Sequence, residues 1–304
     1  MVNRMTPFSG PAAGGSVLRR QLQLGGVVRA PGCFDSLSAR IIEHAGFTAS
    51  FLGGFSVSAA SLGLPDVGLL SFGEILHQAR SVALATSLPV IGDADTGYGN
   101  EANVERTTLG YARAGLACVM IEDQTWPKRC GHTTGKAVVG RREAVRRVRA
   151  AVRARDEYGL DILVMARTDA NATDGFDEAI WRAQAFADAG ADLTFLEAPD
   201  SVEQMRRYCE LVPGWKTANL VEDGKTPWLS PRELEEVGYR LALYPVSLLL
   251  RSMASMRAAA DELAGRADRP TPRLSFDAAR ALVGWPEYEA RLRTYEAESE
   301  PEDN

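Results

Sequence analysis

One unit recurs four times along the chain and limits the folds that are open to it. In each copy a helical pattern ends at a glycine and an apolar run follows: EHAGFTASFLGG (43–54), ARAGLACVMIED (112–123), ADAGADLTFLEA (187–198) and EEVGYRLALYPV (235–246). Glycine suits a helix C-terminus, because a positive φ is inexpensive only without a Cβ. The apolar runs have strand length and are mostly apolar throughout, as strands covered on both faces are. The unit therefore predicts helices that alternate with parallel strands.

Four further strand-like runs lie at 26–31, 88–95, 161–168 and 215–220, with helical patterns between them. Eight strands alternating with helices predict an α/β protein of the (β/α)8 TIM-barrel type, and the 304 residues accommodate such a barrel of about 250 residues with additions. A doubly wound open sheet is the rival fold. No GxGxxG fingerprint follows the first predicted strand, which favours the barrel.

The chain divides into four predicted parts. We expect a flexible lead-in over 1–20, the barrel over 21–265, a C-terminal helical extension over 266–294 and an acidic tail over 295–304. The tail, YEAESEPEDN, contains five acids and no aliphatic side chain larger than alanine.

Composition excludes several classes of protein. The formal charge of −6 argues against a general nucleic-acid binder, and no apolar run reaches the roughly 18 residues that span a membrane. The N-terminus has no apolar segment of signal-peptide length. Four cysteines (Cys33, Cys118, Cys130 and Cys209) form no CxxC pair, so we expect reduced thiols and a cytoplasmic protein.

The predicted strand ends carry polar side chains. Seven residues beyond the glycine of each repeat stand Gly53, Glu122, Glu197 and Pro245. In a barrel, the C-terminal ends of the strands and the loops after them form the active-site face, so these positions converge on one mouth.

Four acids are expected at that mouth: Asp93 and Asp95 in GDADTGYGN, Glu122, and Asp66 in the loop SLGLPD. Carboxylates gathered there repel one another unless a cation neutralises them, and oxygen ligands, partly through water, suit Mg²⁺. The alternative is that these acids cap helices or pair with surface cations. Their place at consecutive strand ends favours the metal.

Arg167, Glu197 and Asn219 also end predicted strands. The planar fork of Arg167 can hold a substrate carboxylate, or it can be a structural partner for Glu197 or Asp169, and the two roles are compatible. Glu197 and Asn219 can orient or protonate a substrate, or be structural. Cys130 lies in the polar loop KRCGHTTGK, where neighbouring cations lower a thiol pKa and favour acid–base use over an inert core position.

The arginine-rich segment 141–155 permits two interpretations. It can be a nucleic-acid-binding stripe, but Glu143 is spaced to pair with Arg146 and Arg147 and the whole protein is acidic. We therefore predict a solvated outer face of the barrel.

The motifs GDADTGYGN, IEDQTWPKRCGH, ARTDA, FLEAP and ANLVEDGKTPWLSPRELEEVGYRLALYP resemble the isocitrate lyase/phosphoenolpyruvate mutase superfamily, from about residue 26 to 250. The KRCGH loop resembles the branch of 2-methylisocitrate lyase, 2,3-dimethylmalate lyase, petal death protein and oxaloacetate hydrolase. Carboxyphosphoenolpyruvate phosphonomutase is similar around GKTPWL and KRCGH.

The resemblance implies a role for each matching residue. Asp93 would bind Mg²⁺ (or Mn²⁺) directly, with Asp66, Asp95 and Glu122 acting mainly through metal-bound waters. Arg167 would bind the substrate carboxylate near Glu197 and Asn219. Lys128, Cys130 and His132 would lie on a gating loop, with Cys130 as the proton donor. Gly53, Gly54 and Phe55 would cradle the 2-oxo acid, and Pro245 is grouped with these substrate-binding residues. Family members commonly carry Ser or Thr where this chain has Gly53.

The implied activity is Mg²⁺-dependent cleavage of a 2-hydroxy di- or tricarboxylate, of 2-alkylmalate or 2-methylisocitrate type, to a 2-oxo acid and a saturated acid. Hydrolysis or decarboxylation of oxaloacetate and P–C bond formation are the alternative reactions, and a barrel that only binds a keto acid is the non-enzymatic one. The resemblance also implies a homotetramer in which the helix after Pro245 is exchanged between subunits; RSMASMRAAADEL (251–263) has the amphipathic period for such docking.

Overall fold

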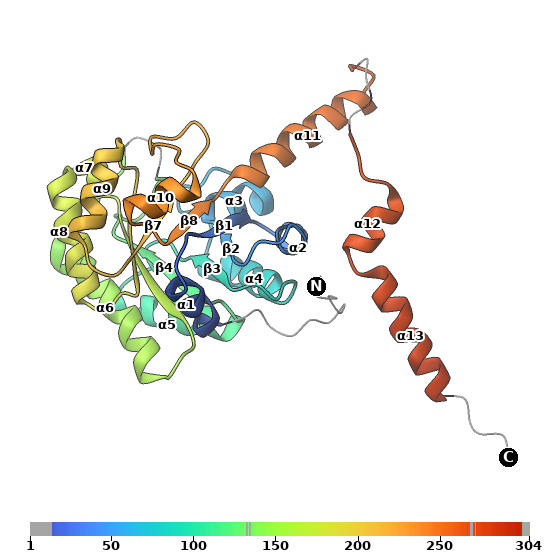
Figure 1. Ribbon diagram of the computed structural model, residues 1–304, viewed down its shortest axis with the longest axis horizontal. Coiled ribbons are helices and arrows are strands. Elements are labelled where there is room, and N and C mark those ends of the chain that lie inside the picture. The colour runs from blue at the N-terminus through green and yellow to red at the C-terminus, as the bar shows by residue number, and fades with distance from the viewer. Residues whose placement is uncertain (1–13, 132, 134, 268–269, 271, 300–304) are drawn as a thin grey trace.

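The computed structural model describes residues 14–131, 133, 135–267, 270 and 272–299. Eight parallel strands form a closed barrel in chain order, with β8 pairing back to β1 (Figure 1). The strands are β1 (Val28–Cys33), β2 (Ser50–Leu52), β3 (Val90–Asp93), β4 (Cys118–Glu122), β5 (Leu163–Thr168), β6 (Leu193–Leu196), β7 (Trp215–Asn219) and β8 (Leu241–Tyr244). The predicted (β/α)8 barrel is confirmed.

Helices surround the barrel and extend beyond it (Figure 1). They are α1 (Gly15–Gln23), α2 (Ser36–His44), α3 (Gly54–Val57), the π-helical η1 (Ser58–Leu62), α4 (Phe72–Ala83), α5 (Glu101–Ala114), α6 (Arg141–Glu157), α7 (Ala170–Thr173), α8 (Phe176–Asp188), α9 (Val202–Leu211), α10 (Pro231–Val237), α11 (Ser247–Leu263), α12 (Phe276–Leu282) and α13 (Trp285–Ser299). Additional C-terminal helices were expected and are present.

The repeat glycines do what the sequence predicts. Gly115 ends α5 with φ 95° and Gly238 ends α10 with φ 116°, both in the left-handed region. Gly46 and Gly190 also have positive φ, at 81° and 96°. Each allows the chain to turn from a helix directly into a strand.

The interior of the barrel is packed with apolar side chains, among them Phe51, Met120 and Phe195. The buried side chains of Leu18 and Leu22 on α1 belong to the same cluster. Residues 15–20, predicted as part of a flexible lead-in, are therefore helical. These residues form a helix because two leucines spaced i, i+4 fall on one face and complete the core of the barrel.

Helix α6 matches the predicted solvated face only in part, because Arg146 is exposed whereas Arg147 is buried and donates to the Gln124 carbonyl at 2.8 Å. Arg147 pairs with Glu143 as predicted, at 2.7 Å. Arg146 pairs instead with Glu101 of α5. Arg146 thus has a different partner from the predicted Glu143.

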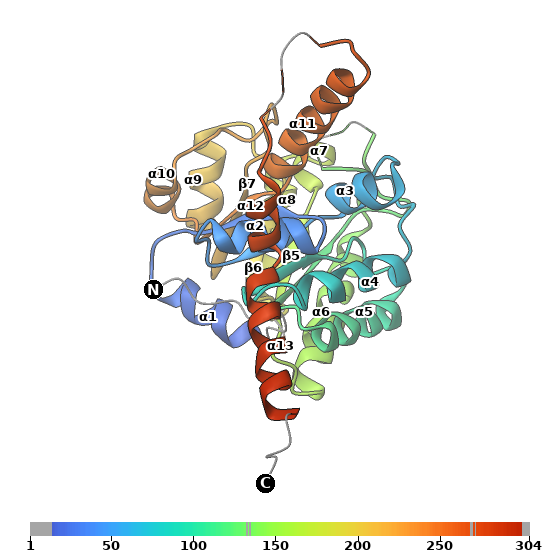
Figure 2. The same cartoon turned by 90° about the vertical axis from the view of Figure 1, so that its right-hand side faces the viewer.

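The C-terminal helices leave the body of the barrel. Helix α11 projects outward, and α12 and α13 lie apart from the barrel in Figure 1; in the view of Figure 2, turned by 90°, they stand in front of it. Helix α13 runs to Ser299, so helix extends into the region 295–304 predicted as an acidic tail. Helix exchange between subunits stays a prediction. No helix in the described part of the chain is long and apolar enough to cross a membrane.

Candidate active site

A cavity of about 260 Å³ lies where the C-terminal ends of the strands meet. The predicted site residues that line it are Gly53, Gly54, Phe55, Asp66, Asp93, Glu122, Lys128, Cys130, Arg167, Glu197, Asn219 and Pro245. Asp95 contacts the lining residue Lys128. His132 lies outside the described residues. The fold thus gathers residues from seven strands, β2 to β8, and their loops at one mouth.

Asp93 is the last residue of β3 and is held by the backbone around it. Its Oδ2 accepts a hydrogen bond from the Gly54 amide at 3.0 Å, and its Oδ1 accepts one from the Asp95 amide at 3.1 Å. Tyr111 donates its hydroxyl to the Asp93 carbonyl at 2.6 Å. A Cβ at Gly54 would approach Asp93 Oδ2 to 3.1 Å, so glycine is what allows the backbone to come this close.

Asp66 and Asp95 share the ammonium group of Lys128. Lys128 Nζ lies 2.6 Å from Asp66 Oδ1 and 2.7 Å from Asp95 Oδ1, and all three side chains are buried. Burial raises the pKa of Asp95 to about 6; Lys128 opposes the rise, and the neighbouring Asp93 and Asp66 add to it. A carboxylate in this position gains from any further positive charge.

Glu122 ends β4 beside Arg167, with 3.5 Å between Glu122 Oε2 and Arg167 Nε. Burial raises the pKa of Glu122 well above its ordinary value. The positive charge of Arg167 lowers this pKa, and the negative charge of Asp169 raises it further. Its other oxygen, Oε1, is buried and accepts no hydrogen bond from the described residues. A buried carboxylate oxygen without a donor is costly unless a ligand satisfies it.

These acids fit a divalent ion held largely through water. Within the described part of the chain, no three His, Cys, Asp or Glu side chains are placed to bind one ion directly. Asp93 can offer a direct ligand, while Glu122 Oε1 and Asp95 Oδ1, which lack hydrogen bonds, can accept from metal-bound waters. Few protein ligands and several retained waters are typical of Mg²⁺.

Arg167 is clamped in one orientation. Asp169 accepts from Nε at 2.8 Å and from Nη2 at 3.0 Å, and Glu197 Oε2 lies 3.1 Å from Nη2. The guanidinium carbon lies 5.3 Å from the centroid of the Phe195 ring. Both structural partners considered from the sequence are present. The third nitrogen, Nη1, makes no hydrogen bond with the described residues, and it leaves a donor edge for a carboxylate.

Glu197 and Asn219 lie side by side at the ends of β6 and β7. Asn219 Nδ2 lies 3.2 Å and 3.3 Å from the two carboxylate oxygens of Glu197. The loop residue Gly131 packs over this group, where a Cβ would collide with Glu197 Oε2 and Arg167 Nη2. Cys130 is half-buried and lines the cavity next to it. The loop therefore places the Cys130 thiol in the cavity that Arg167 also lines.

Sequence reasoning missed the residues that hold this loop. Gln124 donates to the Arg129 carbonyl at 2.8 Å and accepts from the Arg129 amide at 2.9 Å. Lys136 Nζ lies 2.5 Å from the Gly131 carbonyl oxygen and 2.6 Å from Asp169 Oδ1. Both flank the KRCGH motif, but only the fold shows what they contact.

Asp123, the second member of the acidic pair after β4, faces away from the cavity. It accepts from Thr168 Oγ1 at 2.7 Å, from the Asp169 amide at 2.9 Å and from Arg182 Nη1 at 3.0 Å. The two neighbouring acids therefore have different contacts. Glu122 faces the cavity, and Asp123 holds the end of β5, the strand that carries Arg167.

The apolar side of the cavity was also missed. Phe51, Phe195, Val221, Val246 and Leu250 line it together with the predicted residues. A Cβ at Gly53 would approach Phe51 Cε1 to 2.9 Å. The Phe51 ring therefore occupies the space into which a serine or threonine side chain at position 53 would project.

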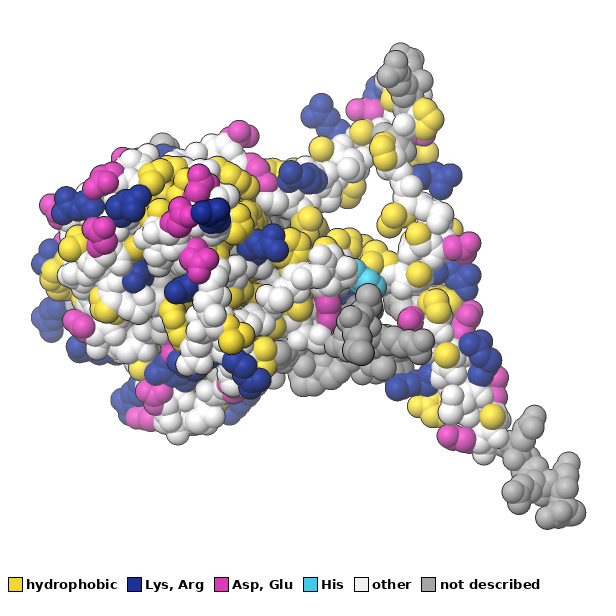
Figure 3. All heavy atoms as spheres, viewed as in Figure 1, with side chains coloured by type: hydrophobic (Ala, Val, Ile, Leu, Met, Phe, Trp, Pro, Cys, Tyr) yellow, Lys and Arg dark blue, Asp and Glu magenta, His cyan; other side chains and the backbone are white. Residues whose placement is uncertain are grey.

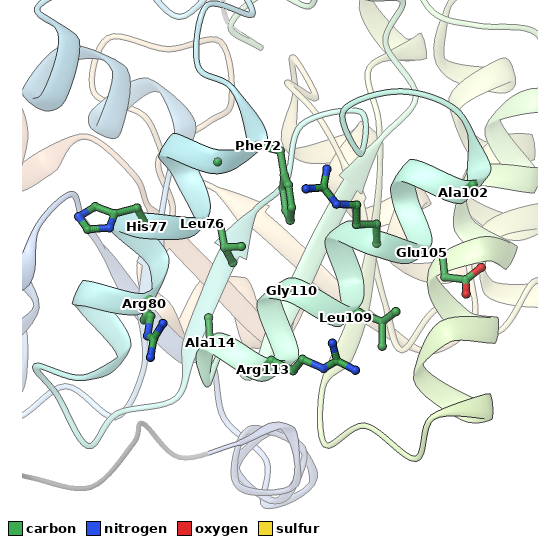
Figure 4. A pocket seen from close by; sticks show the side chains of 12 residues that line it. Phe72, Leu76, His77, Arg80, Ala102, Glu105, Leu109, Gly110, Arg113 and Ala114 are labelled. Carbon is green, nitrogen blue, oxygen red and sulfur yellow. The ribbon is translucent and has the colours of Figure 1, made fainter.

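A second hollow, of about 800 Å³, lies on the outer face of the barrel between α4 and α5 (Figure 4). Leu76 and Leu109 line it with Arg80 and Arg113, and none of the predicted site residues does. It offers no pairing of nucleophile with base among its lining residues. The predicted site residues line the cavity at the strand ends instead.

The chain is similar over most of its length to several known proteins. The family model of phosphoenolpyruvate phosphomutase matches residues 18–264. The chain is 43% identical over 239 residues to 2,3-dimethylmalate lyase of Eubacterium barkeri, covering 79% of this chain and 82% of that protein. It is 37% identical over 283 residues to 2-methylisocitrate lyase of Aeropyrum pernix, covering 91% of this chain and 89% of the relative.

Among solved structures, oxaloacetate acetylhydrolase in complex with 3,3-difluorooxalacetate superposes with a TM-score of 0.88 at 31% sequence identity. The match covers 96% of this chain and 100% of that one. The similarity thus extends over the barrel and nearly the whole chain.

Proposed function

Because the chain belongs to the phosphoenolpyruvate mutase/isocitrate lyase superfamily, we propose that it is a divalent-metal-dependent lyase that cleaves the C2–C3 bond of a 2-hydroxy di- or tricarboxylate. The products are a 2-oxo acid and a saturated acid. The observation that carries the proposal is the Arg167 guanidinium, clamped by Asp169 and Glu197 at the same mouth as Asp93, Glu122 and Cys130.

Each side chain has a task in this reaction. Arg167 offers a donor edge to a substrate carboxylate, and its clamp keeps that edge in place. Asp93, Asp66, Asp95 and Glu122 would hold Mg²⁺, or Mn²⁺ as a substitute, with Asp93 as the direct ligand. When bound, the ion supplies Lewis-acid polarisation of the hydroxyl and developing keto oxygen. The backbone at Gly53, Gly54 and Phe55 lies beside this group and cradles the 2-oxo acid.

Proton transfer completes the cleavage. The substrate hydroxyl loses its proton to a carboxylate of the cavity, and a carbonyl forms at C2 as the C2–C3 bond breaks. The electron pair passes into the departing fragment that carries the 3-carboxylate. Cys130 Sγ–H protonates the carbon of that fragment, while Gly131, packed over Arg167, helps to exclude water.

A product assay tests this proposal. The purified protein is incubated with Mg²⁺, or with EDTA, and 2,3-dimethylmalate, other 2-alkylmalates, 2-methylisocitrate or oxaloacetate; products are identified by mass spectrometry. We expect Mg²⁺-dependent formation of one 2-oxo acid and one saturated acid. No cleavage of any hydroxy acid in the panel would contradict the lyase assignment.

Hydrolysis or decarboxylation of oxaloacetate is the second candidate, and the similarity to oxaloacetate acetylhydrolase over 96% of the chain favours keeping it. In the same assay oxalate and acetate, or pyruvate, from oxaloacetate would reveal it. P–C bond formation requires phosphonate substrates, which are a separate arm of the panel.

We also propose that the protein is a homotetramer built from helix-exchanged dimers, located in the cytoplasm. Support for the assembly comes from exposed apolar side chains on the projecting helices, which Figure 3 shows in yellow. They include Met253, Met256, Trp285, Tyr288 and Leu292. Apolar side chains repeated along unpartnered helices are typical of interfaces. Sedimentation equilibrium of the intact protein checks the assembly state.

A further inference from the structure

The Lys128 ammonium group is enclosed by the carboxylates assigned to the metal. Its Nζ lies 2.6 Å and 2.7 Å from the two oxygens of Asp66 and 2.7 Å from Asp95 Oδ1. The Lys128 side chain is only 3% exposed. The ammonium group thus contacts three carboxylate oxygens, and its charge is neutralised inside the acidic cluster.

The contact with Asp95 is mainly one of charge. Asp95 Oδ1 lies 2.7 Å from Nζ, yet it accepts no hydrogen bond of good geometry. Desolvation lowers the pKa of Lys128, but Asp95, Asp66 and Asp93 outweigh it and raise the pKa well above the ordinary value. With Asp66 and Asp95 both in contact with Nζ, the lysine is paired as a cation and contacts Asp95 as a small cation would.

Charge balance decides how Lys128 and a divalent ion affect each other. Asp66, Asp93 and Asp95 form one group of acids around Nζ, and both oxygens of Asp66 are already engaged by the lysine. A dication that recruited Asp66 and Asp95 through its waters would share these carboxylates with the ammonium group, and the two positive charges would repel each other in this buried setting.

We propose that Lys128 is a placeholder for the divalent ion: its ammonium group neutralises Asp66 and Asp95 and competes with the metal for them. The inference rests on the proposed function, because it takes the acidic cluster as the metal site.

Calorimetric titration of the metal-free protein with Mg²⁺ alone tests this, with no substrate and no turnover. Lys128→Met removes the charge at nearly the same length, and we expect it to bind Mg²⁺ at least about tenfold more tightly than the natural protein. Lys128→Arg keeps the charge and should bind Mg²⁺ as weakly as the natural protein does. Arg129→Met removes a cation from the adjacent, exposed position and should stay within about twofold.

Unchanged or weaker Mg²⁺ binding by Lys128→Met would overturn the inference. If that variant does not fold, as judged by circular dichroism and its melting curve, Lys128→Gln replaces it as the neutral variant and the same result is required. Absence of Mg²⁺ binding in every protein would overturn the metal site itself. Failure of the placeholder role alone is recognised by Mg²⁺-dependent cleavage in the natural protein together with equal affinities in the variants.

Discussion

Asp169 binds one edge of the Arg167 guanidinium group, accepting hydrogen bonds from Nε at 2.8 Å and from Nη2 at 3.0 Å. Both side chains are buried, and Asp169 is itself held by Lys136 at 2.6 Å. A guanidinium fixed in this way presents its remaining edge to the cavity. The orientation of the arginine is therefore a property of the protein before any substrate arrives.

Asp169→Asn should lower kcat/KM by roughly 100-fold, because the amide cannot accept both hydrogen bonds and Arg167 loses its fixed position. The loss should appear in KM as well as kcat, since Arg167 binds substrate. Steady-state kinetics on the substrate found in the product assay provide the measurement. Asp174→Asn, which changes an exposed acid after α7, is the matched control and should leave both constants unchanged.

Cys130→Ser should reduce kcat by roughly 100- to 10,000-fold, because a hydroxyl is a much weaker acid than a thiol for protonating the departing fragment. Binding of a non-reactive dicarboxylate in the presence of Mg²⁺, followed by calorimetry, should persist. Cys209→Ser alters a half-buried thiol on α9, far along the chain, and should retain activity. A fully active Cys130→Ser protein would remove the thiol from the mechanism.

Gly131→Ala should lower kcat by roughly 100-fold, because the added methyl group collides with Glu197 Oε2 and Arg167 Nη2 and pushes the thiol away from the site. Gly140→Ala is the control, since nothing lies within 4 Å of its Cβ position. Comparison of kcat in the two variants, with melting temperatures measured in parallel, separates loop position from global stability. Equal kcat values would show that the contact of Gly131 is unimportant.

The sequence predicted the barrel because its signal is repeated. Gly46, Gly115 and Gly190 each end a helix ahead of a buried apolar run, and the strand ends then follow by spacing alone. The same logic placed Glu122 and Glu197 at one mouth. The sequence could not show which of the neighbouring acids Glu122 and Asp123 faces the cavity. Only the path of the chain after β4 directs Asp123 toward Arg182.

Contacts between distant loops were equally hidden. Lys136 looks like an ordinary surface lysine in the sequence, yet its ammonium group is buried between Gly131 and Asp169. Helix α1 escaped notice because two leucines in nine residues give too short a period to distinguish a docked helix from a lead-in. Both depend on tertiary partners that are far away in the chain.

Leu18→Ala tests the corrected N-terminus. Leu18 is fully buried in the barrel interior, so its truncation should lower the free energy of unfolding by about 2–5 kcal/mol. Leu24→Ala changes a residue that is 81% exposed just after the same helix and should alter stability by less than about 0.5 kcal/mol. Urea denaturation followed by circular dichroism gives both values. Equal effects would mean that α1 does not dock.

The raised pKa of Asp95 makes the stability of the metal-free protein depend on pH. Its folded pKa is about 6, above the ordinary 3.8, because burial disfavours the charged form. The unfolded chain releases this proton more readily, so folding loses stability as pH rises from about 4 through 6. Asp95→Asn removes that loss: it should stabilise the metal-free protein by up to about 3 kcal/mol at pH 7 and should give no such gain at pH 4. Urea titrations at the two pH values in EDTA measure the difference.

Asp161→Asn is the control, because it changes an acid at the opposite end of the barrel, for which no such gain is expected. An equal gain in both variants, or none in Asp95→Asn, would contradict the raised pKa of Asp95.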